Sequence, residues 1–383
     1  MEVTVEKIVP KGFGLAFAKD LTIFVPLSAP GDRLRVTLWE IKGRTAFAEI
    51  DEIIESSPER TSPPCKYFGI CGGCDFQQFS YQRQLAAKVE IIKDSLSRIG
   101  KIEMSEIPII SSPKEHEYRT RALWRVDAAA RKMGYYKRNS HDVVDVEHCP
   151  VLDPTLNATL QQFRAEMNDG RFWSDKAAVE AAIGTNGEVS VYCADIAGPV
   201  VDISAAAAGE RFSFNARTFF QGNLSLIDEL VDLAVNGSEG EHALDLYSGV
   251  GLFSLPLARN FKRVTGVESN ERAVEYARRN ASDAGLSNVE FHDKPVGKFL
   301  AESDGKADLV LLDPPRAGTE KFVIQRVIKM APLEVSYVAC DPSILARDLR
   351  RLIDGGYKIE SLTALDLFPQ THHVEAVARL SRL

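Results

Sequence analysis

The stretch "LDLYSGVGLFSLPLA", Leu244–Ala258, decides the fold of the C-terminal half of this chain. An apolar run that predicts a buried strand leads into a glycine-rich turn and then into a predicted helix. Gly249 and Gly251 allow the backbone to come close to a ligand at the start of that helix. The next predicted strand ends in "GVES", which places Glu268 about 20 residues beyond the glycines, where a carboxylate accepts hydrogen bonds from both ribose hydroxyls of an adenosine.

The alternation of strands and helices continues from about residue 215 to Cys340. It predicts an α/β fold with a parallel sheet and helices on both faces. Asp313 follows the strand "ADLVLL", so we expect it at the carboxyl edge of the sheet, beside the glycine turn. A dinucleotide site would have the pattern G-x-G-x-x-G, but Ser254 occupies the last position. The motif therefore favours S-adenosylmethionine in a Rossmann-like class I methyltransferase domain, and an ordinary tight turn beside a surface glutamate is the alternative.

Cys340 ends the strand "VSYVAC", one strand beyond Asp313, and so lies at the same edge. We expect the N-terminus of the helix that starts at about Ser343 to favour its thiolate form. Glu375 enters an apolar strand, where an unpaired carboxylate would be costly, so we interpret it as a site residue whose pKa is raised toward that of a base. An inert buried thiol is the alternative for Cys340. A metal site at His372–His373 is disfavoured, because adjacent side chains of an extended segment point apart.

A methyl donor, a thiolate and a carboxylate base together suit methylation of uracil at carbon 5. This carbon is a poor nucleophile until a thiolate adds to carbon 6, and a base must then remove the carbon 5 proton so that the thiol can leave. Enzymes that act on cytosine often have a Pro-Cys pair, whereas "DPPRAG", Asp313–Gly318, contains no cysteine. We therefore predict that Cys340 is the nucleophile and Glu375 the base. The uridine must leave its stack to be attacked, and Phe219 or Phe220 is a candidate to hold it.

Six motifs, in this order, resemble those of the RNA uracil-5 methyltransferases. They are "FFQGN" (Phe219–Asn223), "LDLYSGVG" (Leu244–Gly251), "GVE" (Gly266–Glu268), "LLDPPRAG" (Leu311–Gly318), "YVACDP" (Tyr337–Pro342) and "FPQTHHVE" (Phe368–Glu375). The resemblance implies that four residues line the cofactor and uracil pocket: Gln221, Tyr247, Glu268 and Asp313. It also implies the roles given above for Cys340 and Glu375. Ala339 stands where Ser is common and Leu252 where some members have Asn, which affects only details of cofactor contact.

Residues 1 to about 57 contain short β-rich runs separated by Gly and Pro turns, which predicts a small barrel of the oligonucleotide-binding type. A β-appendage that only stabilises the chain is the alternative. The N-terminal half resembles the iron–sulfur-containing members of the family, which act mainly on large-subunit ribosomal RNA and begin with a TRAM domain, a small RNA-binding barrel. We divide the chain into a TRAM-like barrel (1–57), a central α+β domain that holds a cluster and binds RNA (58–214) and a methyltransferase domain (215–383).

Four of the six cysteines fit one metal site. Cys65, Cys71 and Cys74 have the spacing C-x5-C-x2-C, in which "CGGC" makes a tight turn that can point both thiols at one centre, and Cys149 supplies a distant fourth ligand. Four thiolates suit either zinc or a [4Fe–4S] cluster, and the spacing does not separate them. The resemblance implies the cluster, with zinc as the alternative. Cys193 lies in a strand pattern and is expected in the core.

A basic segment in the middle of the chain predicts a face that contacts RNA. Between Glu117 and His141, seven residues are basic and two are acidic, with Trp124, Tyr135 and Tyr136 interleaved. This composition is typical of a surface that follows phosphates and stacks bases on aromatic rings, and a solvated sheet face is the alternative. The net charge of −8 argues only weakly against RNA binding, because binding depends on where the charge lies.

No apolar run approaches the ~20 residues needed to span a bilayer, and no signal-peptide core follows Met1. We therefore expect a cytoplasmic protein with no membrane partner, and we expect it to be a monomer. The site residues and the family resemblance imply an enzyme that uses S-adenosylmethionine to methylate a uridine, and the resemblance implies that this uridine is in 23S ribosomal RNA. Two other functions stay open: the same reaction on transfer RNA, and RNA binding without catalysis. The presence of both Cys340 and Glu375 disfavours the second.

Overall fold

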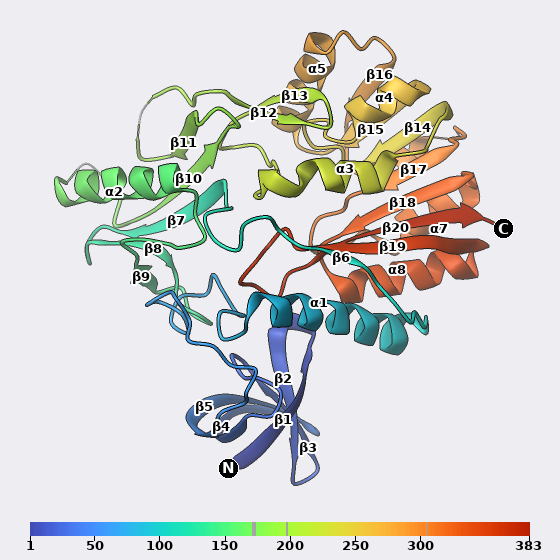
Figure 1. Ribbon diagram of the computed structural model, residues 1–383. Coiled ribbons are helices and arrows are strands. Elements are labelled where there is room, and N and C mark those ends of the chain that lie inside the picture. Colours follow the sequence, from blue (N-terminus) through green and yellow to red (C-terminus); the bar gives the residue numbers. More distant parts are fainter. Residues whose placement is uncertain (171–173, 197, 304) are drawn as a thin grey trace.

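The computed structural model describes residues 1–170, 174–196, 198–303 and 305–383. Figure 1 shows a small barrel at the N-terminus, a sheet from the middle of the chain, and a larger sheet flanked by helices that contains the C-terminus. Among the described residues, no helix is long and apolar enough to cross a membrane.

The first five strands close into a barrel in the order β1-β2-β3-β5-β4, which confirms the predicted barrel. Their bounds are β1 Glu2–Val9, β2 Phe13–Ala18, β3 Leu21–Val25, β4 Arg33–Lys42 and β5 Thr45–Glu55. Alternation along each strand sets the inside: in β4, Leu34 and Val36 are buried while Arg35 is exposed. Gly14 is required in β2, because a Cβ atom there would lie 1.9 Å from Oγ of Ser28.

The middle of the chain forms an antiparallel sheet in the order β11-β10-β7-β8-β9. Its strands are β7 Arg121–Asp127, β8 Lys132–Tyr136, β9 Val143–Asp145, β10 Lys176–Ile183 and β11 Val189–Cys193. Helix α2 (Pro154–Asn168) begins at an N-cap formed by Asp153 and packs on this sheet through Leu156 and Leu160. Cys193 is buried in the same core.

The C-terminal sheet has the order β16-β15-β14-β17-β18-β20-β19-β6. Its strands are β6 Ile109–Ile110, β14 Gly240–Leu246, β15 Phe261–Glu268, β16 Val289–Asp293, β17 Leu309–Leu312, β18 Glu334–Ala339, β19 Tyr357–Leu365 and β20 Glu375–Arg382. The five strands from β16 to β18 are parallel, but β20 runs antiparallel to both β18 and β19. The predicted parallel sheet is confirmed for the five strands up to β18. The direction of β20 was not predicted: it is antiparallel to β19, because the loop of residues 366–374 is too short for the crossover that a parallel pair requires.

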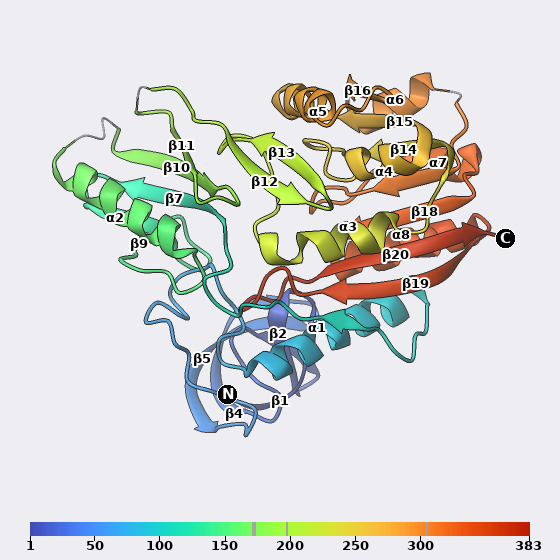
Figure 2. The same ribbon diagram turned by 45° about the horizontal axis from the view of Figure 1, so that its top comes forward.

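Helices cover both faces of this sheet, as predicted (Figure 2). One face shares a core with α3 (Ile227–Val235), α4 (Ser254–Asn260) and α5 (Glu271–Asp283). The other face shares a core with α1 (Tyr81–Ser95), α6 (Val296–Glu302), α7 (Lys321–Met330) and α8 (Pro342–Asp354). The apolar strand runs recognised in the sequence are buried because both faces are covered.

Parts of the chain between residues 58 and 214 pack with the C-terminal sheet. Strand β6 pairs with β19, and α1 contacts α8. The hairpin of β12 (Ile203–Ala207) and β13 (Glu210–Phe214) lies against α5, and Phe212 belongs to the same core as α4 and α5. The central and C-terminal parts are therefore joined by shared packing and not only by a linker.

A buried ion pair joins α1 to the loop after β19. Lys88 and Asp366 are both fully buried. The Nζ atom of Lys88 donates to the Asp366 carboxylate and, at 3.0 Å, to the backbone oxygen of Phe368. Burial lowers the pKa of Lys88, and the attraction of Asp366 opposes that effect. Because a buried charge is costly without its partner, each residue depends on the other.

Replacing Lys88 by Met should lower the free energy of unfolding by about 3–5 kcal/mol, because the Asp366 carboxylate is left buried without its counter-charge. Urea unfolding followed by far-ultraviolet circular dichroism measures the loss. Lys262→Met is the control: it removes an exposed ion pair with Glu241 and should change stability by less than about 0.5 kcal/mol. A loss for Lys88→Met as small as that of the control would contradict the prediction.

Candidate active site

Three residues with positive φ shape the turn that follows β14. Tyr247 has a φ of 68°, Gly249 of 53° and Gly251 of 95°. At Gly251 a Cβ atom would lie 2.8 Å from Cδ1 of Leu255, so a side chain does not fit there. The Tyr247 hydroxyl is hydrogen-bonded to Thr319 Oγ1 at 2.7 Å, which ties this turn to the loop after β17.

Glu268 ends β15 with its carboxylate against the glycine turn. Its Oε2 atom accepts a hydrogen bond from the backbone N–H of Gly249 at 3.2 Å, and its Oε1 atom accepts one from the N–H of Asn270 at 2.8 Å. The Oε1 atom also accepts a hydrogen bond from the Ser269 hydroxyl at 3.3 Å, so Oε2 is the oxygen that keeps a lone pair for a ribose hydroxyl. The structure thus brings Gly249 and Glu268 together at the carboxyl edge of the sheet.

Three carboxylates, Asp245, Glu268 and Asp313, gather at this edge. Burial and the charge of Glu268 raise the pKa of Asp245 to about 7. Burial and the charges of Asp245 and Glu268 raise the pKa of Asp313 to about 7. Mutual repulsion of this kind is relieved by a cation, and S-adenosylmethionine carries a sulfonium and an ammonium group. The residues at this edge therefore fit that cofactor.

The segment "FFQGN" lies where the central sheet meets the C-terminal sheet, because it forms a β-bridge with the residues that lead into β7. Gln221 is buried. Phe220 stacks on Phe214 with ring centroids 4.5 Å apart and belongs to the core, whereas Phe219 is 67% exposed. Phe220 is therefore not free to contact a displaced base, and Phe219 is the candidate of the two that stays accessible. Contact between Gln221 and the cofactor stays a prediction.

The pairing of β18 with β20 brings Cys340 and Glu375 together. The antiparallel register pairs Ala339 with Ala376, so one step further along it Cys340 lies opposite Glu375. Directly opposed residues of an antiparallel pair have Cβ atoms about 5 Å apart on one face of the sheet. The predicted nucleophile and the predicted base therefore face each other at the carboxyl end of β18.

Both groups have strongly shifted acidities. Burial and the charge of Asp313 raise the pKa of Glu375 well above its usual range, and Arg316 opposes this shift. Burial and the charge of Glu375 raise the pKa of Cys340 to about 12, again opposed by Arg316. In the free protein the thiol is therefore protonated at neutral pH.

The predicted activation of Cys340 by a helix N-terminus is wrong for the free protein. Helix α8 does begin directly after the cysteine, but the Asp341 side chain caps it. The Asp341 carboxylate accepts hydrogen bonds from the backbone N–H groups of Ser343 at 2.8 Å and Ile344 at 3.2 Å. The partial positive charge of the helix end is thus already satisfied by an acid.

Arg316 is a residue of this site that the sequence analysis missed. It is exposed in the loop after β17, and its charge acts on Cys340, Glu375 and His373. A guanidinium in this place stabilises negative charge that develops on a thiolate or on a reacting ring. The sequence could have indicated this residue, because Arg316 directly follows the two prolines of "DPPRAG", at the edge of the sheet where ligands bind.

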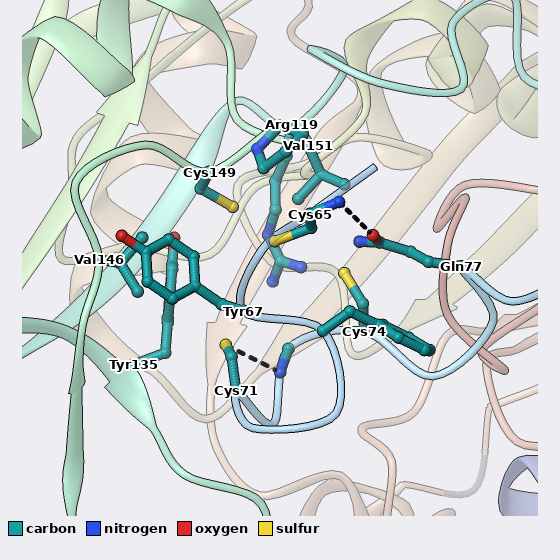
Figure 3. A pocket seen from close by; sticks show the side chains of 13 residues that line it. Cys65, Tyr67, Cys71, Cys74, Gln77, Arg119, Tyr135, Val146, Cys149 and Val151 are labelled. Atoms are coloured by element: carbon teal, nitrogen blue, oxygen red, sulfur yellow. Dashed lines mark hydrogen bonds between the residues drawn. The ribbon is translucent and has the colours of Figure 1, made fainter. Parts of the chain in front are cut away.

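The four predicted metal ligands line one cavity of about 100 Å³, and their sulfur atoms point toward the same space (Figure 3). Cys65, Cys71 and Cys74 come from the loop before α1, and Cys149 comes from the segment after β9. All four are free thiols. Burial raises the pKa of Cys71 to about 11 and that of Cys74 to about 12. Within the described part of the chain, no group of three or more His, Cys, Asp or Glu residues is arranged to hold a single metal ion.

The basic segment offers a smaller RNA-contacting surface than its composition predicts. Trp124 is fully buried under α2, because strand alternation in β7 turns it inward, so its predicted role in stacking bases is wrong. Tyr135 and Arg119 line the cysteine cavity, and Arg121 donates to a backbone oxygen at 2.9 Å. Three basic residues of the segment are exposed: Arg131, Lys132 and Lys137.

Comparison with known proteins places this site in a family. The family model for tRNA (uracil-5-)-methyltransferase matches residues 201–383, and that for the TRAM domain of tRNA (uracil(54)-C(5))-methyltransferase matches residues 1–58. An uncharacterized RNA methyltransferase of Thermosynechococcus vestitus is 31% identical over 100% of this chain and 98% of its own length. The 23S rRNA (uracil(1939)-C(5))-methyltransferase RlmD of Enterobacter sp. strain 638 is 33% identical over 96% of this chain and 93% of its own.

A solved structure matches the whole fold. The crystal structure of Pyrococcus abyssi tRNA (uracil-54, C5)-methyltransferase in complex with S-adenosyl-L-homocysteine is 27% identical and aligns with a TM-score of 0.79 over 99% of this chain and 100% of that one. Fold and site thus define a Rossmann-like, S-adenosylmethionine-dependent methyltransferase with an N-terminal TRAM barrel, which confirms the predicted architecture and enzyme class. The chain belongs to the RNA (uracil-5-)-methyltransferase family.

Iodoacetamide should alkylate Cys340 slowly, with a rate that still rises at about pH 10, because the pKa of this thiol is about 12. Glu375→Gln removes a negative charge beside the sulfur, so the pKa of Cys340 should fall and the rate at about pH 9 should rise several-fold. Mass spectrometry of the Cys340 peptide measures the rate. Glu334→Gln, at the opposite end of β18, should leave it unchanged. A wild-type rate that levels off near pH 8 would contradict the raised pKa.

Proposed function

We propose that this protein methylates carbon 5 of a uridine in RNA through a covalent bond between Cys340 and the uracil ring, and that Glu375 removes the carbon 5 proton. One observation carries the proposal: β18 and β20 pair up to Ala339 and Ala376, and Cys340 and Glu375 are the next residue on each side, close enough for the charge of Glu375 to act on the thiol. Carbon 5 and carbon 6 of uracil are bonded neighbours. Two side chains whose Cβ atoms are about 5 Å apart can therefore reach one carbon each.

The reaction begins at carbon 6. The Cys340 proton leaves to solvent and the thiolate sulfur bonds to carbon 6, while the electron pair of the carbon 5–carbon 6 double bond moves toward the carbon 4 oxygen. The product of this step is an enolate with electron density at carbon 5. Arg316 favours the step, because its charge stabilises both the thiolate and the enolate.

The remaining steps return the enzyme to its starting form. S-adenosylmethionine, when bound, would supply the methyl group that carbon 5 takes up and would leave as S-adenosylhomocysteine. Glu375 then accepts the carbon 5 proton, the carbon 5–carbon 6 double bond re-forms, and the carbon 6–sulfur bond breaks to release Cys340 as a thiolate. Cys340 takes up a proton from solvent and Glu375 gives its proton to solvent. Glu375 must be ionised to accept this proton, and the charge of Arg316 favours that form because it opposes the raised pKa. The residues proposed to hold the cofactor are Gln221, Tyr247, Gly249, Gly251, Glu268 and Asp313.

Ribosomal RNA is the substrate we propose, with transfer RNA as the second candidate. The relatives that act on 23S rRNA, 33% identical over nearly the whole chain, support ribosomal RNA. The Pyrococcus abyssi enzyme, which aligns with a TM-score of 0.79, supports transfer RNA. RNA binding without catalysis is disfavoured, because a binding module has no need of a thiol and a carboxylate opposed at the cofactor edge.

A [4Fe–4S] cluster is the group we propose for Cys65, Cys71, Cys74 and Cys149, with zinc as the alternative. Four thiols around one cavity are the donors that such a cluster requires. A single zinc ion binds sulfur at about 2.3 Å and would leave no free space between the ligands. A cavity of about 100 Å³ suits a larger group. The cluster would tie the loop before α1 to the segment that carries Cys149.

The barrel (1–57) and the exposed basic residues of the central domain (58–214) are the surfaces proposed to contact RNA, while residues 215–383 carry out catalysis. The first part would contact RNA through its β-barrel surface and the second through its positive charge, and the third contains the residues proposed to react. The enzyme is proposed to act as a monomer in the cytoplasm, where its cysteines stay reduced.

Glu375→Gln should trap the enzyme on natural RNA. Without a base, the methylated adduct forms but cannot eliminate, so turnover should fall by about 10²–10⁴-fold while a covalent protein–RNA complex accumulates on denaturing gels. Glu360→Gln, an exposed carboxylate on the neighbouring strand β19, should turn over normally. Full loss of both turnover and covalent complex would show that Glu375 acts before, and not after, methyl transfer.

Mass-spectrometric mapping of 5-methyluridine in ribosomal and transfer RNA tests the proposed function directly. We expect the modification at one uridine of 23S rRNA to disappear in cells that lack the protein, and to return with the wild-type chain but not with Cys340→Ala. Loss confined to transfer RNA would assign the second substrate. An unchanged pattern in both RNAs would contradict the function.

Protein purified without oxygen should contain iron and acid-labile sulfide in equal amounts, because a [4Fe–4S] cluster holds four of each. Cys149→Ser should lose both, since it removes one of the four ligands. Cys193→Ser should keep both, because Cys193 does not line the cavity of the other four cysteines. Zinc in place of iron would contradict the cluster.

A further inference from the structure

The loop of residues 366–374, called here the base loop, leads directly into Glu375. It leaves the sheet at the end of β19 and returns at the first residue of β20, so Glu375 lies where sheet pairing ends and loop conformation begins. If the base loop moves, Glu375 is therefore the first residue of β20 that moves with it. What holds this loop also holds the proposed base.

Many of the base loop's contacts come from the N-terminal half of the chain. Gln84 exchanges hydrogen bonds with Gln370, through its Oε1 atom to the backbone N–H at 2.8 Å and through its Nε2 atom to the side-chain oxygen at 3.1 Å. The Tyr118 hydroxyl donates to the backbone oxygen of Pro369 at 2.9 Å. Lys88 binds the start of the loop, as described above.

The turn that carries Cys71 and Cys74 also contacts the base loop, near the end that leads into Glu375. Asp75, the residue after Cys74, accepts a hydrogen bond at 2.6 Å on Oδ2 from Nδ1 of His372. The backbone N–H groups of Asp75 and Phe76 both donate to the backbone oxygen of Gln370, each at 3.0 Å. Arg138 donates to the other Asp75 oxygen at 2.9 Å, which fixes the carboxylate from the opposite side.

His372 is three residues before Glu375, and its ring lies 4.1 Å from that of His373. His373 in turn is close enough to Arg316 to be affected by its charge. The Asp75–His372 hydrogen bond therefore acts on the last residues of the base loop, next to the groups that surround the reacting ring. Its partners are 297 residues apart in sequence.

We infer that Asp75 and His372 are positioning residues for the second half of the reaction: their hydrogen bond holds the base loop so that the Glu375 carboxylate stays in reach of carbon 5. The inference rests on the proposed function, because it assumes that Glu375 is the base. Cys340 directly follows β18 and lies outside the base loop, so formation of the covalent adduct does not depend on this contact. The same contact links the cysteine turn to the catalytic edge.

Asp75→Ala and His372→Ala test the inference by separating the two halves of the reaction. With 5-fluorouridine RNA, which stops after methyl transfer, both variants should form the adduct within about twofold of the wild-type rate. With natural RNA, both should turn over up to about 10²-fold more slowly and accumulate the covalent complex, because a small misplacement of a catalytic group costs this much. Asp75→Asn keeps a hydrogen-bond acceptor and should restore most of the turnover.

Two controls keep the outcomes distinct. Glu147→Gln breaks the exposed ion pair of Glu147 with Lys66, beside Cys65, and should turn over normally. His372→Ala leaves the cysteine turn unaltered, so it answers the question even if Asp75→Ala folds poorly. Equal slowing of adduct formation and turnover, without a trapped complex, would overturn the inference. Adduct formation by Cys340→Ala would instead overturn the proposed function.

Discussion

The antiparallel pairing of β18 with β20 is the constraint on which the site depends. Strand β18 is the last of five parallel strands, so its carboxyl end carries Cys340 to the edge where the glycine turn, Glu268 and Asp313 lie. Strand β20 runs in the opposite direction, so its first residue, Glu375, arrives at that same edge. A shift of the register by one residue would turn the carboxylate to the other face of the sheet. The opposed thiol and carboxylate thus follow from strand direction and register.

This edge of the sheet concentrates negative charge in a buried place. Asp245, Asp313 and Glu375 all have raised pKa values, and the charge of Glu375 contributes to the raised pKa of Cys340. The free enzyme therefore holds Cys340, the proposed nucleophile, as a thiol, a form less open to oxidation than a thiolate. Arg316 and a cationic cofactor act in the opposite sense, because positive charge favours the ionised forms. We therefore expect the Cys340 thiol to become reactive only when the cofactor and the RNA are bound beside Arg316.

Sequence reasoning succeeded where a function is local and failed where it depends on packing. The glycine turn and Glu268 were predictable because a strand, a tight turn and a spaced acid lie within one short stretch. The direction of β20 was not predicted, because it depends on which strands are neighbours. Trp124 was assigned to the surface from composition, although strand alternation buries it. Contacts such as Asp75 with His372 join residues far apart in the chain and have no sequence signal.

The measurement that tests this account most directly is the intact mass of the protein after incubation with S-adenosylmethionine and RNA that contains 5-fluorouridine. Fluorine cannot be removed as a proton, so an addition–elimination enzyme stops as a stable methylated adduct. The account predicts one RNA fragment per chain, located at Cys340 after digestion and missing in Cys340→Ala. An adduct at another residue, or no adduct on an RNA that the enzyme methylates in its natural form, would contradict it.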